Sequence, residues 1–245
     1  MTEPGASSSE RGAVLVLHGF TARPRTVEPL GAHLAAAGFT YAIPPLRGHG
    51  THYRDLAAVN WQDWVEDGRN TFESLARHHS RVSIVGHSVG ALVAAALAAG
   101  DPRVASLVLV APAILYANPA VTLLPLLRRF VTEWPSGPDS INDPALRTAY
   151  AGTNYPRFPV RAFEQAFTLS RATPGNLRRV KCPALVVQSR LDRVIKPRSA
   201  EVAYASLGSD HKRLTWLQRS NHELFWDLER DQLAGLIVAF LKETA

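Results

Sequence analysis

The pentapeptide Gly86–Gly90 reads Gly-His-Ser-Val-Gly and sets one serine, Ser88, between two glycines. A strand-like run, Val82–Val85, comes directly before it, and the small-residue segment Ala91–Ala99 after it reads as a buried helix. This order is the nucleophile-elbow pattern, in which a sharp turn presents the serine hydroxyl and the first N–H groups of the helix face any anion formed beside it. Ser88 is therefore the candidate nucleophile. The alternative is a serine in a purely structural glycine-rich turn.

The Ser88 hydroxyl needs a general base, because serine is a weak nucleophile near neutral pH. We expect His222, which follows a strand-like run ending at Leu217, to be that base. His87 is the rival candidate, but adjacent side chains at a sharp elbow project in different directions, so its ring is not expected to reach the serine. The sequence therefore predicts that Ser88 passes its proton to His222.

The base in turn needs a carboxylate that fixes its tautomer and stabilises its imidazolium form. Asp192 is the predicted partner, since it follows the strand-like run Ala184–Gln188 and so lies at a strand end. Glu223 and Asp227 are the alternatives. Glu223 directly follows His222 and is poorly placed to reach its ring, whereas Asp227 fits the turn or helix start after the histidine. The predicted chain order is serine, then acid, then histidine.

An anion that forms at a reacting carbonyl requires preorganised donors, and in this arrangement they are the backbone N–H groups of Phe20 and Val89. Phe20 follows His18 and Gly19 in a loop, and its ring is expected either to wall a substrate pocket or to pack within that loop. His18 is expected to be a structural hydrogen-bonding residue. No acid or cysteine accompanies the other histidines at ligand spacing, so we expect neither a metal site nor a cofactor.

The elements that must position these residues are short apolar strands that alternate with helices. Continuous apolar or β-branched runs occupy residues 13–17, 39–43, 82–85, 105–110, 184–188 and 213–217. Such alternation predicts an α/β fold with a mostly parallel sheet of about six strands, joined by right-handed crossovers and flanked by helices. Because chemistry collects beyond the carboxyl ends of parallel strands, His18, Ser88, Asp192 and His222 are expected to meet at one edge.

The alternation stops between residues 113 and 180, where we expect helical stretches separated by turns. We therefore divide the chain into a disordered tail (1–12), a core in two parts (13–112 and 181–245) and a small helical cap inserted between strands (113–180). An insertion of this length must lie at a sheet edge or over a sheet end, where it acts as a lid. The candidates for a substrate pocket are Phe20, Leu123, Leu127, Trp134, Tyr155, Phe163 and Phe167.

The composition is that of an ordinary globular protein, with 46% hydrophobic and 20% charged residues in 245. The net charge is +6, but the basic residues are scattered, so nucleic acid is not an expected partner. One cysteine, Cys182, excludes an intramolecular disulfide and fits a reducing compartment. Residues 1–12 do not read as a signal peptide, and the longest apolar stretches are too short to span a bilayer. We expect a cytoplasmic protein without stable membrane association; the sequence does not indicate its oligomeric state.

Five segments of the sequence resemble segments of the α/β-hydrolase superfamily, in particular its bacterial carboxylesterase and monoacylglycerol lipase branch. They are Leu17–Phe20, Arg47–Gly50, Gly86–Gly90, Ser189–Asp192 and Ser220–His222, and the resemblance extends from residue 13 to residue 243. The chain lacks the first two strands of the larger family fold, so a six-stranded version is implied.

The resemblance implies a serine hydrolase that needs no cofactor and acts on small-molecule carboxylic esters with short or medium acyl chains. A monoacylglycerol lipase is the alternative within the same branch. Two alternatives come from other classes: an acyltransferase that uses the same residues, and a non-catalytic binding protein with the same fold.

Overall fold

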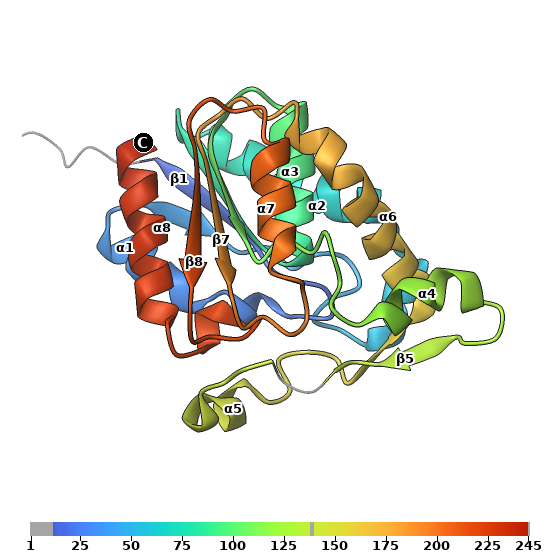
Figure 1. Ribbon diagram of the computed structural model, residues 1–245. Coiled ribbons are helices and arrows are strands. Elements are labelled where there is room, and N and C mark those ends of the chain that lie inside the picture. The colour runs from blue at the N-terminus through green and yellow to red at the C-terminus, as the bar shows by residue number, and fades with distance from the viewer. Residues whose placement is uncertain (1–11, 138–139, 245) are drawn as a thin grey trace, which may run out of the picture.

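The computed structural model describes residues 12–137 and 140–244, without the side chains of Pro125 and Leu127. Its centre is a six-stranded sheet (Figure 1). The strand order is β2-β1-β3-β4-β7-β8, and every neighbouring pair is parallel. The strands are β1 (Ala13–Leu17), β2 (Thr40–Ala42), β3 (Val82–His87), β4 (Val104–Val110), β7 (Ala184–Ser189) and β8 (Lys212–Leu217). The prediction of an α/β fold with about six parallel strands is confirmed.

The central strands are buried on both faces, which explains their nearly unbroken apolar sequences. Every residue of β1, β3 and β7 is buried. A parallel sheet covered by helices on both sides selects such runs, because neither face of a central strand meets solvent. The edge strand β2 differs, since it has three residues and all are exposed or half-buried.

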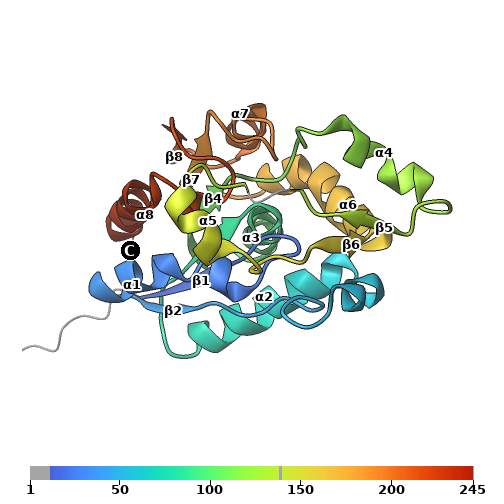
Figure 2. The same cartoon turned by 90° about the horizontal axis from the view of Figure 1, so that it is seen from below.

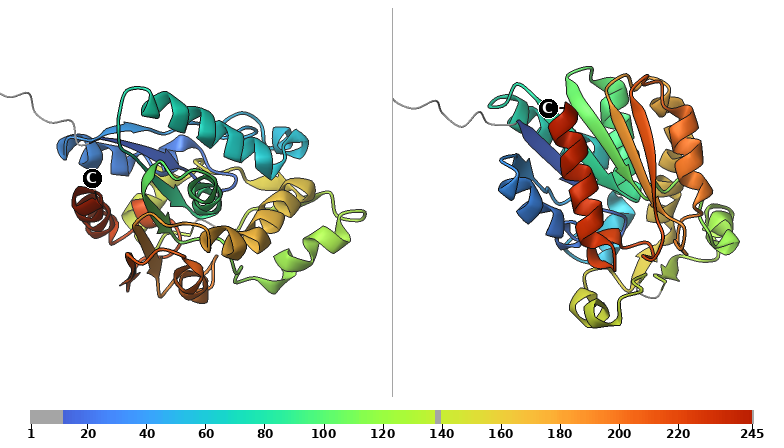
Figure 3. Two further views of the ribbon diagram at one scale, coloured as in Figure 1. Left: turned by 90° about the horizontal axis from the view of Figure 1, so that it is seen from above. Right: turned by 60° about the vertical axis from the view of Figure 1, so that its left-hand side comes forward.

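Helices form a layer on each face of the sheet. One layer consists of α1 (Pro29–Ala36) and α8 (Arg230–Thr244), the blue and red helices that lie on the same side of the sheet in Figure 3. The other layer consists of α2 (Trp61–Ala76), α3 (Val89–Gly100), α6 (Val160–Leu177) and α7 (Arg198–Ser206). Within the described residues, three short 3-10 helices lie in loops: η1 (Pro24–Thr26), η2 (Tyr53–Ala58) and η3 (Leu224–Trp226).

The chain between β4 and β7 forms α4 (Pro119–Leu127), β5 (Glu133–Pro135), α5 (Pro144–Tyr150) and β6 (Arg157–Pro159) before α6 begins. The segments from α4 to β6 lie beyond the carboxyl end of the sheet, the end seen in Figure 2. β5 and β6 form an antiparallel pair in which Trp134 lies opposite Phe158. The sequence predicts only helices here. Strands of three residues are too short to show a period-two pattern, so this pair was missed.

The predicted division of the chain at residues 113 and 181 stays a prediction. Within the predicted cap, α6 packs against α3 and so belongs to the layer that covers the sheet. Apart from Gly12, the predicted disordered tail lies outside the described residues.

Candidate active site

Ser88 lies at the turn between β3 and α3, with a backbone φ of 56°, a value that side-chain-bearing residues rarely adopt. The two flanking glycines make this turn possible. A Cβ atom on Gly86 would lie 2.4 Å from the carbonyl oxygen of Gly90, and one on Gly90 would lie 2.4 Å from the carbonyl oxygens of Leu17 and His18. The turn is therefore pressed against the end of β1, which brings the loop after β1 beside Ser88.

Ser88, His222 and Asp192 are joined by hydrogen bonds in that order. The Ser88 Oγ is 3.0 Å from His222 Nε2, and His222 Nδ1 is 2.8 Å from Asp192 Oδ2. The other oxygen of Asp192 accepts the backbone N–H groups of Val194 and Ile195, both at 2.8 Å. All three side chains are buried. Because Asp192 accepts a proton from Nδ1, His222 is left with an unprotonated Nε2 that can accept the proton of Ser88.

The charges of the pair reinforce one another. Burial alone lowers the pKa of His222, but the charge and hydrogen bond of Asp192 outweigh it, so the pKa of His222 is raised above its usual value. Burial alone raises the pKa of Asp192, but the charge and hydrogen bond of His222 and the N–H groups of Ile195 and Val194 outweigh it. The pKa of Asp192 is therefore lowered below its usual value. Asp192 is therefore a carboxylate at neutral pH, ready to stabilise an imidazolium at His222.

The rival residues weighed from the sequence lie elsewhere. His87 Nε2 donates to the backbone carbonyl of His222 at 3.0 Å, and no hydrogen bond joins His87 to Ser88 in the part of the chain that the structure describes. Burial lowers the pKa of His87. Both ring nitrogens of His222 are already engaged by Asp192 and Ser88, and Asp227 accepts only backbone N–H groups. His87 therefore supports the backbone of the residue predicted as base.

The loop that carries Phe20 passes directly beside Ser88. A Cβ on Gly19 would lie 3.3 Å from the Cβ of Ser88. Thr21, the next residue but one, has a φ of 63°, so the chain turns sharply here. Val89 is the first residue of α3. The assignment of the Phe20 and Val89 N–H groups as oxyanion donors stays a prediction, and the close approach of Gly19 to Ser88 is the geometry that it requires.

Two buried histidines with neighbouring rings lie beside this loop, and one of them, His18, is hydrogen-bonded to it. His18 Nδ1 donates to the carbonyl of Gly19 at 3.0 Å, and its Nε2 accepts the N–H of Leu46 at 3.2 Å. His49 Nδ1 lies 3.1 Å from the carbonyl of Arg47. Burial lowers the pKa of His18 to about 4 and that of His49 to about 3. Both rings are therefore neutral at physiological pH and act as fixed hydrogen-bonding groups.

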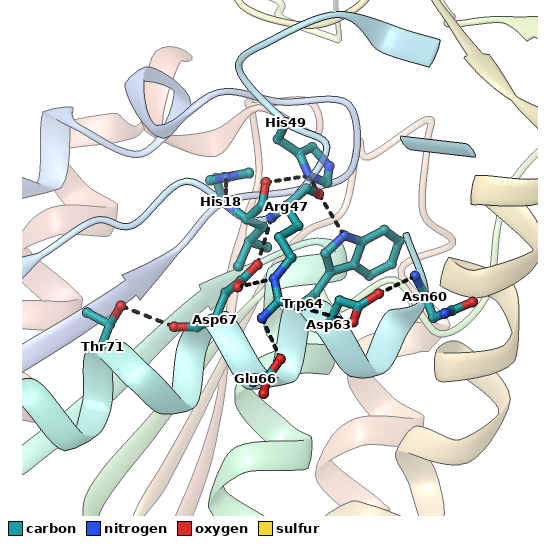
Figure 4. Close-up of polar contacts among 10 residues, drawn as sticks. His18, Arg47, His49, Asn60, Asp63, Trp64, Glu66, Asp67 and Thr71 are labelled. Atoms are coloured by element: carbon teal, nitrogen blue, oxygen red, sulfur yellow. Dashed lines mark hydrogen bonds and ion pairs between the residues drawn. The ribbon is translucent and has the colours of Figure 1, made fainter. Parts of the chain in front are cut away.

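Arg47 lies in the loop that also carries Leu46 and His49, and it anchors this loop to α2 through ion pairs (Figure 4). Its guanidinium group forms ion pairs with Asp63 at 3.2 Å, Asp67 at 2.7 Å and Glu66, and its carbonyl accepts the indole N–H of Trp64 at 3.1 Å. Sequence reasoning missed this anchor. The only signal was the spacing of the three acids, which places them on adjacent turns of one helix.

Most of the predicted pocket residues gather in one apolar group at the insertion. Leu124, Phe158, Val160 and Phe163 form its buried centre, and Phe20, Trp134 and Phe167 pack against it. Tyr155 instead donates its hydroxyl to the carbonyl of Gly48 at 3.0 Å and accepts the N–H of Thr51 at 2.9 Å. Leu123 is 52% exposed on α4, and the side chain of Leu127 lies outside the described part. Leu124 and Phe158 were not among the pocket candidates. The pocket stays a prediction.

No three His, Cys, Asp or Glu side chains come together as possible metal ligands within residues 12–137 and 140–244. Over the same residues, none of the helices has the length and apolar character needed to cross a bilayer.

Comparisons with known proteins agree with the fold. A family model described as serine aminopeptidase, S33, matches residues 8–229. The chain is 28% identical to a thermostable monoacylglycerol lipase of Bacillus sp. strain H-257, covering 99% of this chain and 95% of that protein. It is 25% identical to a carboxylesterase of Bacillus subtilis strain 168, covering 94% of this chain and 92% of that protein.

Among solved structures, one of the metagenome-derived lipolytic enzymes LipS and LipT matches with a TM-score of 0.88 and 31% identity, covering 96% of this chain and 94% of that chain. A structure of Paleococcus ferrophilus monoacylglycerol lipase matches with a TM-score of 0.83 and 19% identity, covering 96% of each chain, which supports the fold alone. Since the family model spans nearly the whole chain, the protein belongs to the serine aminopeptidase S33 family of the α/β-hydrolase superfamily.

Proposed function

We propose that the protein is a serine carboxylesterase that hydrolyses short- to medium-chain carboxylic esters through an acyl-enzyme on Ser88. The observation that carries this proposal is the hydrogen-bonded series from Ser88 through His222 to Asp192. The names of the relatives, monoacylglycerol lipase, carboxylesterase and lipolytic enzyme, favour esters as the substrate class.

In the proposed reaction, Ser88 Oγ attacks the ester carbonyl while its proton moves to His222 Nε2. The N–H groups of Phe20 and Val89 stabilise the resulting oxyanion, and Asp192 stabilises the imidazolium. His222 then gives the proton to the departing alcohol oxygen, which leaves an acyl group on Ser88. A water molecule, deprotonated by His222, attacks the acyl carbon, and the proton returns to Ser88 as the carboxylic acid departs.

A monoacylglycerol lipase is the second candidate within this chemistry, favoured by the similarity to the Bacillus enzyme of that name. An aminopeptidase is a third, because the family description names that activity. The same serine, histidine and aspartate serve all of these, so the substrate must decide.

The deciding experiment compares hydrolysis of p-nitrophenyl esters of increasing acyl length, a monoacylglycerol and an aminoacyl p-nitroanilide, with Ser88→Ala as the control. We expect ester hydrolysis that is lost in the control, with labelling of Ser88 by a fluorophosphonate. Cleavage of the anilide without cleavage of any ester would make the protein an aminopeptidase. Transfer of the acyl group to an added alcohol in preference to water would make it an acyltransferase. No turnover and no labelling would indicate a binding protein.

We further propose that residues 113–180 act as a cap that sets acyl-chain length. The apolar group around Phe158 and Phe163 supports this proposal, because each buried methylene of a substrate contributes about 0.8 kcal/mol. kcat/KM should rise from acetate to a short or medium optimum and then fall. A flat profile would contradict the cap's role.

EDTA should have no effect on ester hydrolysis, and inhibition by EDTA that zinc reverses would indicate a metal enzyme.

We also propose a cytoplasmic location, supported by the single, half-buried cysteine Cys182, which fits a reducing compartment. Fractionation of cells that express the full chain tests this location. Recovery of the protein in a secreted or membrane fraction would contradict it.

A further inference from the structure

Asp227 is a fully buried carboxylate that the proposed reaction does not use. It accepts four backbone N–H groups, two on each oxygen. Oδ1 accepts from Asp143 and Leu228, both at 2.8 Å, and Oδ2 accepts from Asn142 at 2.9 Å and Asn221 at 2.6 Å. A buried charge is stable only when its oxygens are satisfied in this way. These four donors therefore explain why an acid occupies this position.

The four donors come from two different parts of the chain. Asn142 and Asp143 belong to the insertion, immediately before α5, whereas Asn221 belongs to the loop Gln218–Glu223 that carries His222 and is named the His222 loop below. Each carboxylate oxygen accepts one N–H from the insertion and one from the core, since Leu228 lies just beyond this loop. Asp227 thus joins the insertion to the His222 loop at the carboxyl end of the sheet, where α5 lies in Figures 1 and 2.

Two further contacts join the same pair of segments. The N–H of Glu223 donates to the carbonyl of Ser140 at 3.1 Å, and the side-chain amide of Asn142 donates to the carbonyl of Arg219 at 2.7 Å. The N–H groups on both sides of His222, those of Asn221 and Glu223, are therefore held by Asp227 and by the insertion. The position of the imidazole depends on this backbone.

The other end of the same segment of the insertion holds the loop that carries Phe20. The N–H of Tyr155 donates to the carbonyl of Thr21 at 2.9 Å, and the N–H of Arg23 donates to the carbonyl of Thr153 at 3.2 Å. Thr21 has a positive φ, a strained state for a β-branched residue that surrounding contacts must maintain. Residues 140–155 therefore reach from the His222 loop to the predicted oxyanion loop.

We propose that Asp227 is a positioning residue for His222, and that residues 140–155 form a fixed brace across the site. This inference rests on the proposed function, because His222 must be the base for its position to matter. A misplacement of about 1 Å lowers the rate of a positioned reaction about 100-fold. The brace keeps His222 Nε2 at hydrogen-bond distance from Ser88 while Nδ1 stays on Asp192.

The test is Asp227→Asn, a change that leaves the side chain nearly the same in size and shape. An amide oxygen still accepts two N–H groups, but the NH2 group would face the two donors that the other carboxylate oxygen accepted, so one link between the insertion and the core is lost. We expect kcat for p-nitrophenyl butyrate to fall about 100-fold. We also expect the acidic limb of the pH–rate profile to move to lower pH, because the Asp192 contact that raises the pKa of His222 is weakened.

Asp101→Asn is the matched control. Asp101 is also a buried acid that accepts a backbone N–H, that of Arg103 at 2.9 Å, but it follows α3 and precedes β4, at the opposite end of the sheet from Ser88. It should lose stability without moving the pH limb. Equal kcat and equal pH limbs in the two variants, each corrected for its folded fraction, would overturn the proposal.

A second variant, Asn142→Ala, removes the side-chain hydrogen bond to the carbonyl of Arg219 and keeps the backbone N–H that Asp227 accepts. This variant tests the brace if the Asp227→Asn protein does not fold. It should lower kcat several-fold with the same direction of shift in pH, and an unchanged kcat and pH limb would overturn the proposal. An NMR titration of the His222 imidazole separates the two proposals, since it needs no turnover. If the wild type hydrolyses no ester, the proposed function fails. A pKa of His222 that is equal in the Asp227→Asn and Asp101→Asn proteins would overturn the brace.

Discussion

Replacement of Asp192 by asparagine should leave the protein folded and nearly abolish turnover, because the structure dictates how the new amide must lie. Asp192 Oδ1 accepts two backbone N–H groups, from Val194 and Ile195, so only the amide oxygen fits there. The NH2 group then takes the place of Oδ2. That position faces His222 Nδ1 at 2.8 Å and the side-chain nitrogen of Gln188 at 2.7 Å.

Gln188 can accommodate this change. Its side chain is buried, and its Oε1 has no hydrogen-bond partner within the described residues. Rotation of the amide by half a turn presents Oε1 to the new NH2 group, so the free energy of unfolding should change by no more than about 1–2 kcal/mol. His222 must then accept at Nδ1 and carry its proton on Nε2. In that tautomer the ring cannot take the proton of Ser88.

The magnitude follows from the same tautomer problem in a serine-protease triad, where this substitution lowers kcat about 10⁴-fold. That factor corresponds to about 5 kcal/mol of transition-state stabilisation. The assay is kcat at saturating p-nitrophenyl butyrate, together with the rate of Ser88 labelling by a fluorophosphonate and the free energy of unfolding in urea. An Asp192→Asn protein that keeps its stability and stays within tenfold of the wild-type kcat would refute the reasoning.

Three other predictions follow from the site. Ser88→Ala and His222→Ala should each lower kcat about 10⁶-fold, and a double variant much slower than either would show that the two residues do not act as a unit. Because burial lowers the pKa of His18 to about 4 and of His49 to about 3, the unfolded chain binds more protons than the folded one below about pH 6.5. Calorimetry should therefore show that the Tm of the wild type falls as pH drops from 6.5 toward 4. The fall should be less steep in His49→Gln and as steep as in the wild type in His78→Gln, a control at an exposed position. A Tm that rises over this range would contradict the two neutral buried rings. Gly90→Ala should lower the free energy of unfolding by about 1–3 kcal/mol, because its Cβ meets backbone oxygens at 2.4 Å. The control Gly235→Ala, which has open space on α8, should raise it by about 0.5–1 kcal/mol, and equal effects in urea unfolding would refute the steric argument.

The sheet could be predicted because each buried strand is a short continuous run of apolar or β-branched residues in the sequence. The run Ala13–Leu17 coincides with β1, and residues 184–188 fall within β7. One of the helical stretches expected between residues 113 and 180 is α6, which continues to Leu177 through Pro174. A proline inside a helix costs about 3 kcal/mol, but Thr173 and Leu177 are fully buried, so packing against the rest of the fold outweighs local preference.

The site could be predicted only where chemistry restricts the residue type at a strand end. Ser88, Asp192 and His222 meet this condition, and the structure brings them together. The contacts of Arg47 with α2, and those of Asp227 with Asn142 and Asp143, could not be predicted, because they depend on how separate segments pack against one another. Asp227 was considered from the sequence only as an alternative acid for His222. A carboxylate that binds backbone N–H groups leaves no pattern of residue types to read.

The hydrogen bond between Ser88 and His222 joins residues 134 positions apart, and the one between Tyr155 and Gly48 joins residues 107 apart. Contacts between such distant positions require the chain to close large loops, which costs conformational entropy. The nucleophile and its strained turn depend instead on the neighbours β1, β3 and α3. A chain in which only these elements had assembled would hold a serine without a base. The protein therefore gains a base for Ser88 only when the segments that carry Ser88 and His222 have come together.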